Sequence, residues 1–233
     1  MRGLLGGILL FGLAGYAADR AMSRWYATWG TTMPDRRRTM PGDELTPGAT
    51  SQTTRSVEIH ASAGTVWAWL VQIGQDRAGF YSYRALENLA LAEMPKVERI
   101  VMEWQLRERG EVVWLASPDH WGANGKQYIA AIEPKRYFIM TGEADWRSIQ
   151  AGGSAKGTWG FIIEPLGEKR CRLIARSRYT SPPPGFELAH FIMERKMLLR
   201  IKQLAERPPS ATDEPKADLP CDAGCVSSVT SRL

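Results

Sequence analysis

Apolar and polar side chains alternate over residues 54–61, and this alternation predicts the first strand of a folded domain. Val57 and Ile59 lie on one side of the stretch, and Ser56 and Glu58 lie on the other. A period of two is typical of a strand that has one face toward a core. We therefore expect a sheet to begin with these residues.

The apolar spacing next changes to that of a helix. Val66, Leu70 and Ile73 follow one another at intervals of four and three residues, so they fall on one helical face. Ser62 is a residue type that commonly caps a helix N-terminus, and Gly74 is one that commonly ends a helix. The pattern predicts one buried helix between these two positions.

A second short helix is predicted within residues 81–91, which read YSYRALENLAL. Ser82 is its expected start, and Leu86, Leu89 and Ala90 are expected to face inward. The two helices would meet at a corner that contains glycines and charged residues. A helix–turn–helix corner explains the glycines, but it does not explain the aromatic residues that are gathered there.

Short segments rich in branched and aromatic residues then predict an antiparallel run of strands. These segments are residues 110–116, 126–134, 136–142, 157–166 and 170–179. In the last segment, one face carries Arg170, Arg172, Arg176 and Arg178. We expect this arginine face to be exposed to water and the opposite face to be covered.

A long helix is predicted after three consecutive prolines. Its inward stripe consists of Phe186, His190, Met193, Met197, Ile201 and Leu204. Successive members are three or four residues apart, which is the spacing of one helical face. We expect this face to be buried in the core.

The N-terminal segment is the clearest compositional signal. Residues 3–18 contain no charged side chain, and Trp25 and Tyr26 can lie at a membrane interface. The uncharged stretch is slightly shorter than the roughly 20 residues that cross a bilayer. A cleaved signal peptide is the alternative. We expect an uncleaved membrane anchor over residues 1–26, with residues 3–26 in contact with the membrane.

Flanking charge predicts the orientation of this anchor. Arg20, Arg24 and the run 36–38 follow the apolar segment, whereas Arg2 precedes it. Under the positive-inside rule, the soluble domain is expected in the cytoplasm, attached to the cell membrane by a single span. The three cysteines do not form the framework of a disulfide-stapled domain, which agrees with a reducing compartment.

The remaining boundaries follow from composition. Proline, serine and threonine are frequent in residues 27–52, which we interpret as a linker. Residues 53–206 are then the folded domain, and residues 207–233 are predicted to be a disordered tail because they contain few apolar side chains. Cys221 and Cys225 lie in this tail, where their spacing fits either two unpaired thiols or a metal or redox motif.

Charge and motifs exclude several functions. The net charge is +5, and the basic residues are spread along the chain without a basic stripe, so nucleic-acid binding is not predicted. The sequence contains no phosphate-binding loop, nucleophile motif or metal-ligand cluster. No metal and no cofactor are therefore predicted, and the oligomeric state is left open.

Four segments carry a resemblance to a known family. They read PGDEL, VWAWLVQIGQDRAGFYSYRALENL, RIVMEWQLRERGEVV and ARSRY. The sequence over roughly residues 25–206 resembles the START-like superfamily, also called SRPBCC, in its polyketide cyclase/dehydratase-like branch. The resemblance implies an α+β helix-grip fold, in which a curved antiparallel sheet surrounds a long C-terminal helix. In this chain one N-terminal transmembrane helix would precede it.

Members of this family hold greasy molecules in a deep apolar cavity between the sheet and the long helix. The resemblance therefore implies membrane-anchored binding of a hydrophobic small molecule or lipid. The alternative is a cyclase- or dehydratase-type enzyme that acts on a greasy substrate and uses a cavity His or Glu as acid and base. A scaffold with a filled cavity is a third possibility.

Candidate ligand-binding residues are aromatic or carry a polar group near the expected cavity. They are Trp67, Phe80, Tyr81, Tyr83, Glu87, Trp104, Trp159 and His190. For any one tryptophan, ordinary core packing is the simpler interpretation. The four candidates from Phe80 to Glu87 lie at the corner between the short helices, where we expect a gate over the cavity that hinges at Gly74 and Gly79.

Candidate catalytic residues are the titratable groups expected near the cavity. They are Glu87, His120 and His190. Each has a plainer interpretation. His190 fits a hydrogen-bonded core histidine, His120 a solvated loop histidine, and Glu87 an exposed carboxylate on a helix.

Overall fold

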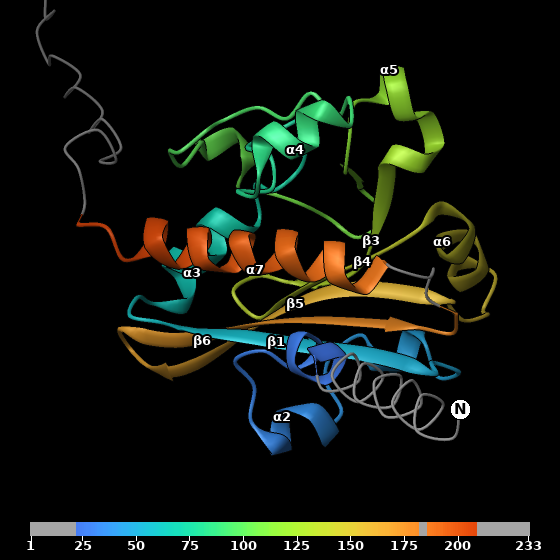
Figure 1. The fold of residues 1–233 in the computed structure, drawn as a ribbon, viewed down its shortest axis with the longest axis horizontal. Coiled ribbons are helices and arrows are strands. Elements are labelled where there is room, and N and C mark those ends of the chain that lie inside the picture. The colour runs from blue at the N-terminus through green and yellow to red at the C-terminus, as the bar shows by residue number, and fades with distance from the viewer. Residues whose placement is uncertain (1–21, 182–185, 209–233) are drawn as a thin grey trace, which may run out of the picture.

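Six antiparallel strands form one sheet in residues 22–181 and 186–208, which are the residues that the computed structural model describes (Figure 1). The strands are β1 (Ser51–Ile59), β2 (Val112–Trp114), β3 (Lys126–Glu133), β4 (Tyr137–Thr141), β5 (Gly157–Gly167) and β6 (Arg170–Tyr179). Their order in the sheet is β1-β6-β5-β4-β3-β2, so the first and last strands are hydrogen-bonded neighbours. The predicted strands and their antiparallel pairing are confirmed.

The helices predicted from the sequence are also present. They are α3 (Ala63–Leu70), α4 (Arg84–Leu89) and the long helix α7 (Phe186–Ala205). The Ser62 hydroxyl caps α3 by accepting a hydrogen bond from the Thr65 backbone N–H at 3.1 Å. Helix α3 ends before Gly74, which has a φ of 135° and pairs with Gly79 in an isolated bridge. The corner after α3 is therefore a closed loop that needs glycine at this backbone conformation.

The structure adds elements that the apolar pattern does not predict. They are the helices α2 (Met33–Arg37), α5 (Pro118–Trp121) and α6 (Glu143–Gln150) and the 3₁₀ turns η1 (Asp43–Leu45), η2 (Met102–Trp104) and η3 (Gly122–Gly125). Helices α2 and α5 and the 3₁₀ turns are too short to show a helical period, and α6, although as long as α3, carries only two large apolar residues, Trp146 and Ile149.

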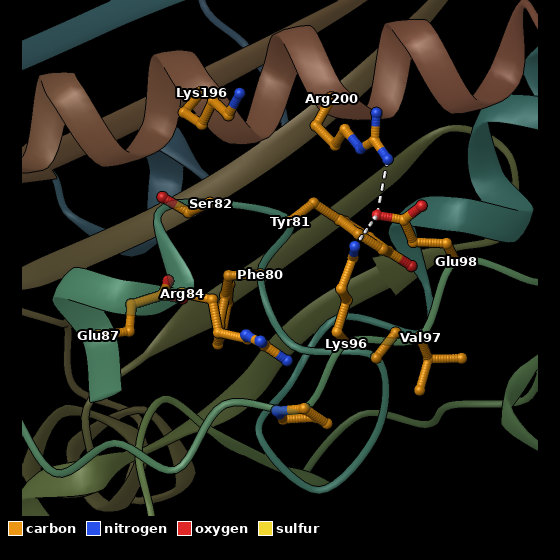
Figure 2. A pocket seen from close by; sticks show the side chains of 12 residues that line it. Phe80, Tyr81, Ser82, Arg84, Glu87, Lys96, Val97, Glu98, Lys196 and Arg200 are labelled. Carbon is orange, nitrogen blue, oxygen red and sulfur yellow. Dashed lines mark ion pairs between the residues drawn. The ribbon is translucent and has the colours of Figure 1, made fainter. Parts of the chain in front are cut away.

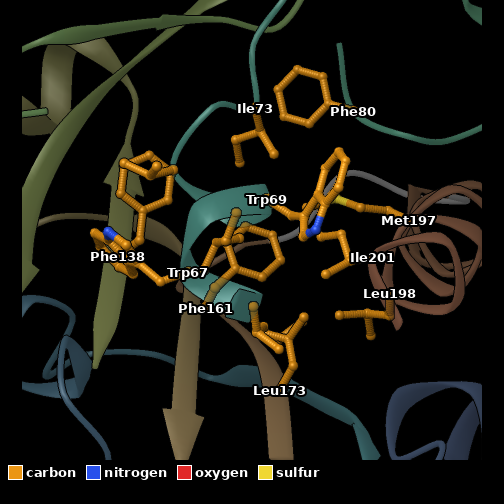
Figure 3. Close-up of a cluster of buried hydrophobic side chains, with 14 of the residues drawn as sticks. Trp67, Trp69, Ile73, Phe80, Phe138, Phe161, Leu173, Met197, Leu198 and Ile201 are labelled. Atoms are coloured by element: carbon orange, nitrogen blue, oxygen red, sulfur yellow. The ribbon is translucent and has the colours of Figure 1, made fainter. Parts of the chain in front are cut away.

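The core lies between the inner face of the sheet and the helices α3 and α7 (Figure 3). Its fully or almost fully buried residues include Ile59, Phe161, Leu173, Leu198 and Ile201. Burial of a side chain of this size contributes about 1.5–3 kcal/mol to stability. The predicted α+β helix-grip arrangement, with an antiparallel sheet around a C-terminal helix, is confirmed.

The outer face of the sheet is covered over much of β6, which corrects the expectation of exposure for Arg172 and Arg176, whereas Arg170 is exposed as expected. Arg176 is only 6% exposed. Its Nε and Nη2 atoms donate to the two carboxylate oxygens of Asp43, both at 2.8 Å. Arg172 makes a similar pair with Asp35, at 3.0 and 2.9 Å. The arginines lie on one face because they hold a covering segment through paired, charge-assisted hydrogen bonds.

The covering segment is residues 27–52, which the composition predicts to be a linker. It contains α2, η1 and the first residues of β1, and both Asp35 and Asp43 are buried in it. Met40 packs against Ile174 of the sheet. Figure 1 shows α2 on the opposite side of the sheet from α7. The segment belongs to the folded unit because its carboxylates pair with the arginines of the sheet.

Helix α4 is oriented differently from the prediction. Leu86 and Leu89 are 54% and 82% exposed, and Ala90 is exposed as well. Glu87 is the one residue of α4 that is half-buried. The inner side of this helix borders hollows in the structure, so it does not meet core side chains that could bury leucines.

In the described part of the chain, no helix is long and apolar enough to cross a membrane. Most of the predicted anchor, residues 1–26, lies outside the described residues, and its last part, residues 22–26, is helical. Residues 209–233, with Cys221 and Cys225, also lie outside the described residues. The anchor and the disordered tail therefore stay predictions.

Candidate functional site

An apolar cavity lies beside the N-terminal half of α7, between that helix, the sheet and the corner after α3. Its volume is about 260 Å³. Its apolar wall is formed by Phe80, Leu115, Trp159, Met193 and Met197. Its polar groups belong to Ser82, Glu87, Gln127, Tyr179, His190 and Glu194. An apolar wall with a few polar groups is the usual composition of a small-molecule site.

Phe80 and Trp159 form one wall of the cavity as a stacked pair. Their ring centroids are 5.8 Å apart, with an interplanar angle of 22°. Trp159 also contacts His190 edge-on, with ring centroids 5.4 Å apart. Aromatic surfaces of this kind offer a large contact area to an apolar ligand at a low cost in side-chain entropy.

A buried carboxylate forms the polar end of the cavity. Glu194 Oε1 accepts a hydrogen bond from Trp159 Nε1 at 2.7 Å, and Glu194 Oε2 accepts one from Arg55 Nη1 at 2.7 Å. Both Arg55 and Glu194 are buried. His190 Nε2 lies 3.5 Å from Glu194 Oε1. The paired charges of Arg55 and Glu194 compensate each other inside an apolar surrounding, where either charge alone would be costly.

Burial changes the proton affinity of the groups beside this pair. Burial lowers the pKa of His190, and the Glu194 carboxylate offsets part of this effect. The neutral imidazole is therefore favoured, and it can both donate and accept a hydrogen bond. Burial raises the pKa of Tyr179 to about 12, so its hydroxyl stays protonated at neutral pH.

Glu87 stands where three hollows meet. It lines the apolar cavity, a wider groove at the surface, and a third hollow that Phe80 also lines. Burial raises the pKa of the Glu87 carboxyl to about 7. A carboxyl with this pKa is present in both protonation states near neutral pH, as a general acid or base requires.

The wider groove opens between α4, η3 and α7. Its volume is about 500 Å³, and it shares Glu87, Leu115 and Met193 with the apolar cavity. Trp121 of α5 and Ile192 of α7 line it and are 44% and 42% exposed. Because the two hollows share three lining residues, the groove adjoins the cavity.

Four of the candidate ligand-binding and catalytic residues come together at the cavity. They are Phe80, Glu87, Trp159 and His190. They come from the corner after α3, from α4, from β5 and from α7, so segments far apart in the sequence converge here. Two of the candidate acid–base groups, Glu87 and His190, therefore face the same space.

Tyr81 and Tyr83 differ, although both belong to the predicted gate. The Tyr81 hydroxyl accepts a hydrogen bond from Gln72 Nε2 at 2.8 Å and donates one to the Trp69 carbonyl at 3.2 Å. Tyr83 is 40% exposed, and Lys196 Nζ lies 5.6 Å from the centroid of its ring. Tyr81 therefore fixes the corner to the core, whereas Tyr83 lies at the surface near α7.

The remaining candidates lie elsewhere. Trp67 is in the core cluster. Trp104 ends η2, where its carbonyl accepts a hydrogen bond from Arg77 at 2.8 Å. His120 is on α5, exposed, with its Nε2 3.3 Å from Glu93 Oε1. These three candidates are not among the residues that line the apolar cavity.

The ion pair at the polar end of the cavity is not among the residues predicted from the sequence. Glu194 is four residues after His190, so it falls on the same face of the predicted helix. Arg55 is two residues before Val57, on the side of β1 that was expected to be apolar. A charged residue on an apolar face signals a buried partner, and both residues carried that signal.

No protein-family model matches the chain, and no curated protein matches it. Solved structures with a similar fold do exist. Protein MLL2253 from Mesorhizobium loti is 13% identical, with a TM-score of 0.41 over 69% of this chain and 100% of that chain. Protein EF2215 from Enterococcus faecalis, of unknown function, is 15% identical, with a TM-score of 0.39 over 70% of this chain and 76% of that chain. A Polyketide_cyc-like protein, Cgl2372 from Corynebacterium glutamicum, is 17% identical, with a TM-score of 0.31 over 66% of this chain and 79% of that chain. At these values no ligand or activity follows from the similarity.

Proposed function

We propose that this protein binds a hydrophobic small molecule or a lipid in the apolar cavity beside α7. The observation that carries the proposal is the cavity itself, whose aromatic and methionine wall ends at the polar groups of Tyr179, His190 and Glu194. Such a site holds an apolar body along its wall and orients one polar group at its end. The groove between α4 and α7 supplies the entrance.

The proposal includes attachment to the cell membrane through residues 3–26, with the folded unit in the cytoplasm. It is supported by the uncharged N-terminal stretch and by the arginines that follow it. A reporter enzyme fused after Leu233 is expected to be active only in the cytoplasm. Reporter activity on the other side of the membrane, or a mature chain that begins near Ala18, would contradict an uncleaved anchor.

The binding proposal is tested by filling the cavity. Met193 is half-buried at the cavity wall, so Met193→Trp adds bulk to open space. The full chain is photolabelled with a decanol that carries a diazirine at its apolar end, and labelled peptides are mapped by mass spectrometry. We expect the cavity residues of the wild type to be labelled and the labelling of Met193→Trp to fall about tenfold.

Met102→Trp is the matched control, because Met102 is 69% exposed on η2 and does not line the cavity. This control should be labelled like the wild type. Both variants should keep a cooperative thermal unfolding transition, which shows that they are folded. Equal labelling of the cavity peptides in Met193→Trp and wild type would refute the proposal.

A cyclase- or dehydratase-type enzyme is the second candidate function. The observation that favours it is the Glu87 carboxyl, because burial at the cavity wall raises its pKa to about 7. Such a group can take up and release a proton in turn at neutral pH. His190 adds a second group that can exchange protons, at the wall of the same cavity.

The enzyme candidate is tested with the molecule that co-purifies with the full chain from its native host, identified by mass spectrometry. Incubation with wild type should convert it, or its biosynthetic precursor, to a product that has lost water or gained a ring. Glu87→Gln keeps the size of the side chain and removes its titration, so it should bind the molecule without converting it. Equal conversion by Glu87→Gln and wild type would exclude Glu87 as the acid–base group.

A further inference from the structure

A third hollow, shown in Figure 2, is also lined by Phe80 and adjoins the apolar cavity. Its volume is about 230 Å³. Helix α7 borders it on one side, and the segments 80–84 and 95–98 border it on the others. Phe80, Ser82 and Glu87 line both this hollow and the apolar cavity, so the two hollows are neighbours.

Four cationic side chains line this third hollow. They are Arg84, Lys96, Lys196 and Arg200. Figure 2 shows Lys196 and Arg200 on α7, with Arg84 and Lys96 on the segments that face this helix. Exposed Arg and Lys side chains are ordinarily solvated, but here four of them, from different segments, line one concave space beside an apolar cavity.

The carboxylates of the third hollow do not neutralise all of these cations. Glu98 Oε1 lies 2.6 Å from Arg200 Nη2 and 3.7 Å from Lys96 Nζ. The Arg200 guanidinium, which binds Glu98, holds the pKa of that carboxyl below its usual range. Among the described residues, no carboxylate forms an ion pair with Arg84 or Lys196. These two cations therefore remain available to a ligand.

We infer that the third hollow binds the anionic group of an amphiphile whose apolar body lies in the neighbouring cavity, with Arg84 and Lys196 as its partners. The inference rests on the proposed binding function and adds the class of ligand, a molecule with a carboxylate or phosphate at one end. Cations bind such groups through charge-assisted hydrogen bonds, and the planar guanidinium matches a carboxylate in two-point contact. Phe80, between the hollows, marks the boundary between head and body.

The first experiment is competition for the photolabel in the apolar cavity. The full chain is held in phosphatidylcholine nanodiscs, and decanoate, decanol and decyltrimethylammonium compete with the diazirine decanol. We expect decanoate to compete about tenfold more strongly than decanol, and the cationic amphiphile to compete more weakly than decanol. Acetate and inorganic phosphate, which are anions without an apolar body, should not compete.

A double variant removes the proposed anion partners. Arg84→Gln with Lys196→Gln should weaken competition by decanoate about tenfold and change competition by decanol less than about twofold. The matched control is Arg37→Gln with Lys169→Gln, which removes the same charge from two exposed positions that do not line the third hollow. This control should behave like the wild type with both competitors.

The outcomes separate the anion site from the proposed function. Equal competition by decanoate and decanol in wild type, or an equal loss in the two double variants, overturns the anion site and leaves cavity binding intact. Competition by acetate as strong as that by decanoate also overturns it, because the apolar body would then contribute nothing. If the cavity is not labelled and no amphiphile competes, the proposed function fails, and the anion site fails with it.

Discussion

The inner face of the sheet is covered by α7 mainly through apolar contacts, with the buried pair Arg55–Glu194 described above, whereas the outer face is covered by residues 27–52 through several paired charges. On the inner face, a hollow of about 260 Å³ interrupts the packing. On the outer face, two nitrogens of Arg176 meet two oxygens of Asp43, each at 2.8 Å. Apolar contacts are non-directional and tolerate such an interruption, but paired hydrogen bonds need a fixed geometry. The face built mainly on apolar contacts is therefore the one that can accommodate a ligand.

Removal of residues 27–52, which cover the outer face, should cause the largest loss of folding stability. Deletion of residues 1–50 takes away the carboxylates that hold Arg172 and Arg176. It also removes the Tyr26 carbonyl, which accepts a hydrogen bond from Arg55 at 2.6 Å. We expect the free energy of unfolding to fall by about 5 kcal/mol or more, which is comparable to the total stability of a typical domain.

Thermal unfolding followed by circular dichroism measures this loss. A chain that lacks only residues 1–21 keeps all of these contacts and serves as the control. Cooperative unfolding of the shorter chain at the wild-type temperature would show that the outer face is stable without its cover.

Removing one outer carboxylate should cause the next largest loss of stability. Asp43→Ala leaves the buried Arg176 without its carboxylate partner and takes the same carboxylate from Arg178, and we expect a cost of about 3–5 kcal/mol in urea unfolding. Arg176→Met in the same chain removes the unpaired charge, so the double variant should recover most of the loss. A double variant as unstable as Asp43→Ala would mean that lost packing, and not the unpaired charge, causes the instability.

A substitution on the inner face should lower the free energy of unfolding less than Asp43→Ala does. Phe161 is fully buried, and its ring centroid lies 5.0 Å from that of Trp159 at the cavity. Phe161→Leu keeps an apolar side chain of similar size, and the neighbouring side chains can readjust, so we expect a cost of about 1.5 kcal/mol in urea unfolding. A cost equal to that of Asp43→Ala would contradict the view that the inner face is the more adaptable one.

The smallest expected effect is a pH dependence of opposite sign on the two faces. On the outer face, burial would raise the pKa of Asp35, but hydrogen bonds from Thr32 and the charge of Arg172 bring it below 3.8. Its stabilising contribution is present above pH 3.8 and is lost as the pH falls through the lowered pKa. On the inner face, burial raises the pKa of Glu87 from 4.5 to about 7. The protonated Glu87 carboxyl contributes fully to folding stability below pH 4.5, and this contribution is lost as the pH rises through about 7.

Urea unfolding of wild type and Glu87→Gln over a series of pH values measures the inner-face effect. As the pH rises from 4.5 to above 7, the wild type should lose about 1 kcal/mol relative to the variant, since water at the cavity wall reduces the full effect of the shift. Parallel profiles for the two chains would contradict the raised pKa. Asp35→Asn provides the corresponding comparison on the acid side.

The elements that face the apolar core could be predicted from the sequence because burial on one side imposes a period of two or of 3.6 residues. The stripe of α7 and the alternation in β1 are examples. Helix α2 has no such period, since the ion pair of Asp35 with Arg172 holds it in place. The polar end of the cavity joins Arg55 to Glu194, which are 139 residues apart, and no local pattern specifies that pairing.

The ion pair at the polar end of the cavity also belongs to a longer hydrogen-bonded path. Arg55 donates to the Tyr26 carbonyl at 2.6 Å and to Glu194 at 2.7 Å. Glu194 accepts in turn from the Trp159 indole at 2.7 Å. In mechanical terms, the residues that follow the N-terminal apolar segment are connected in series with the aromatic wall of the cavity. A force applied at Tyr26 would therefore act on Trp159 through these three hydrogen bonds.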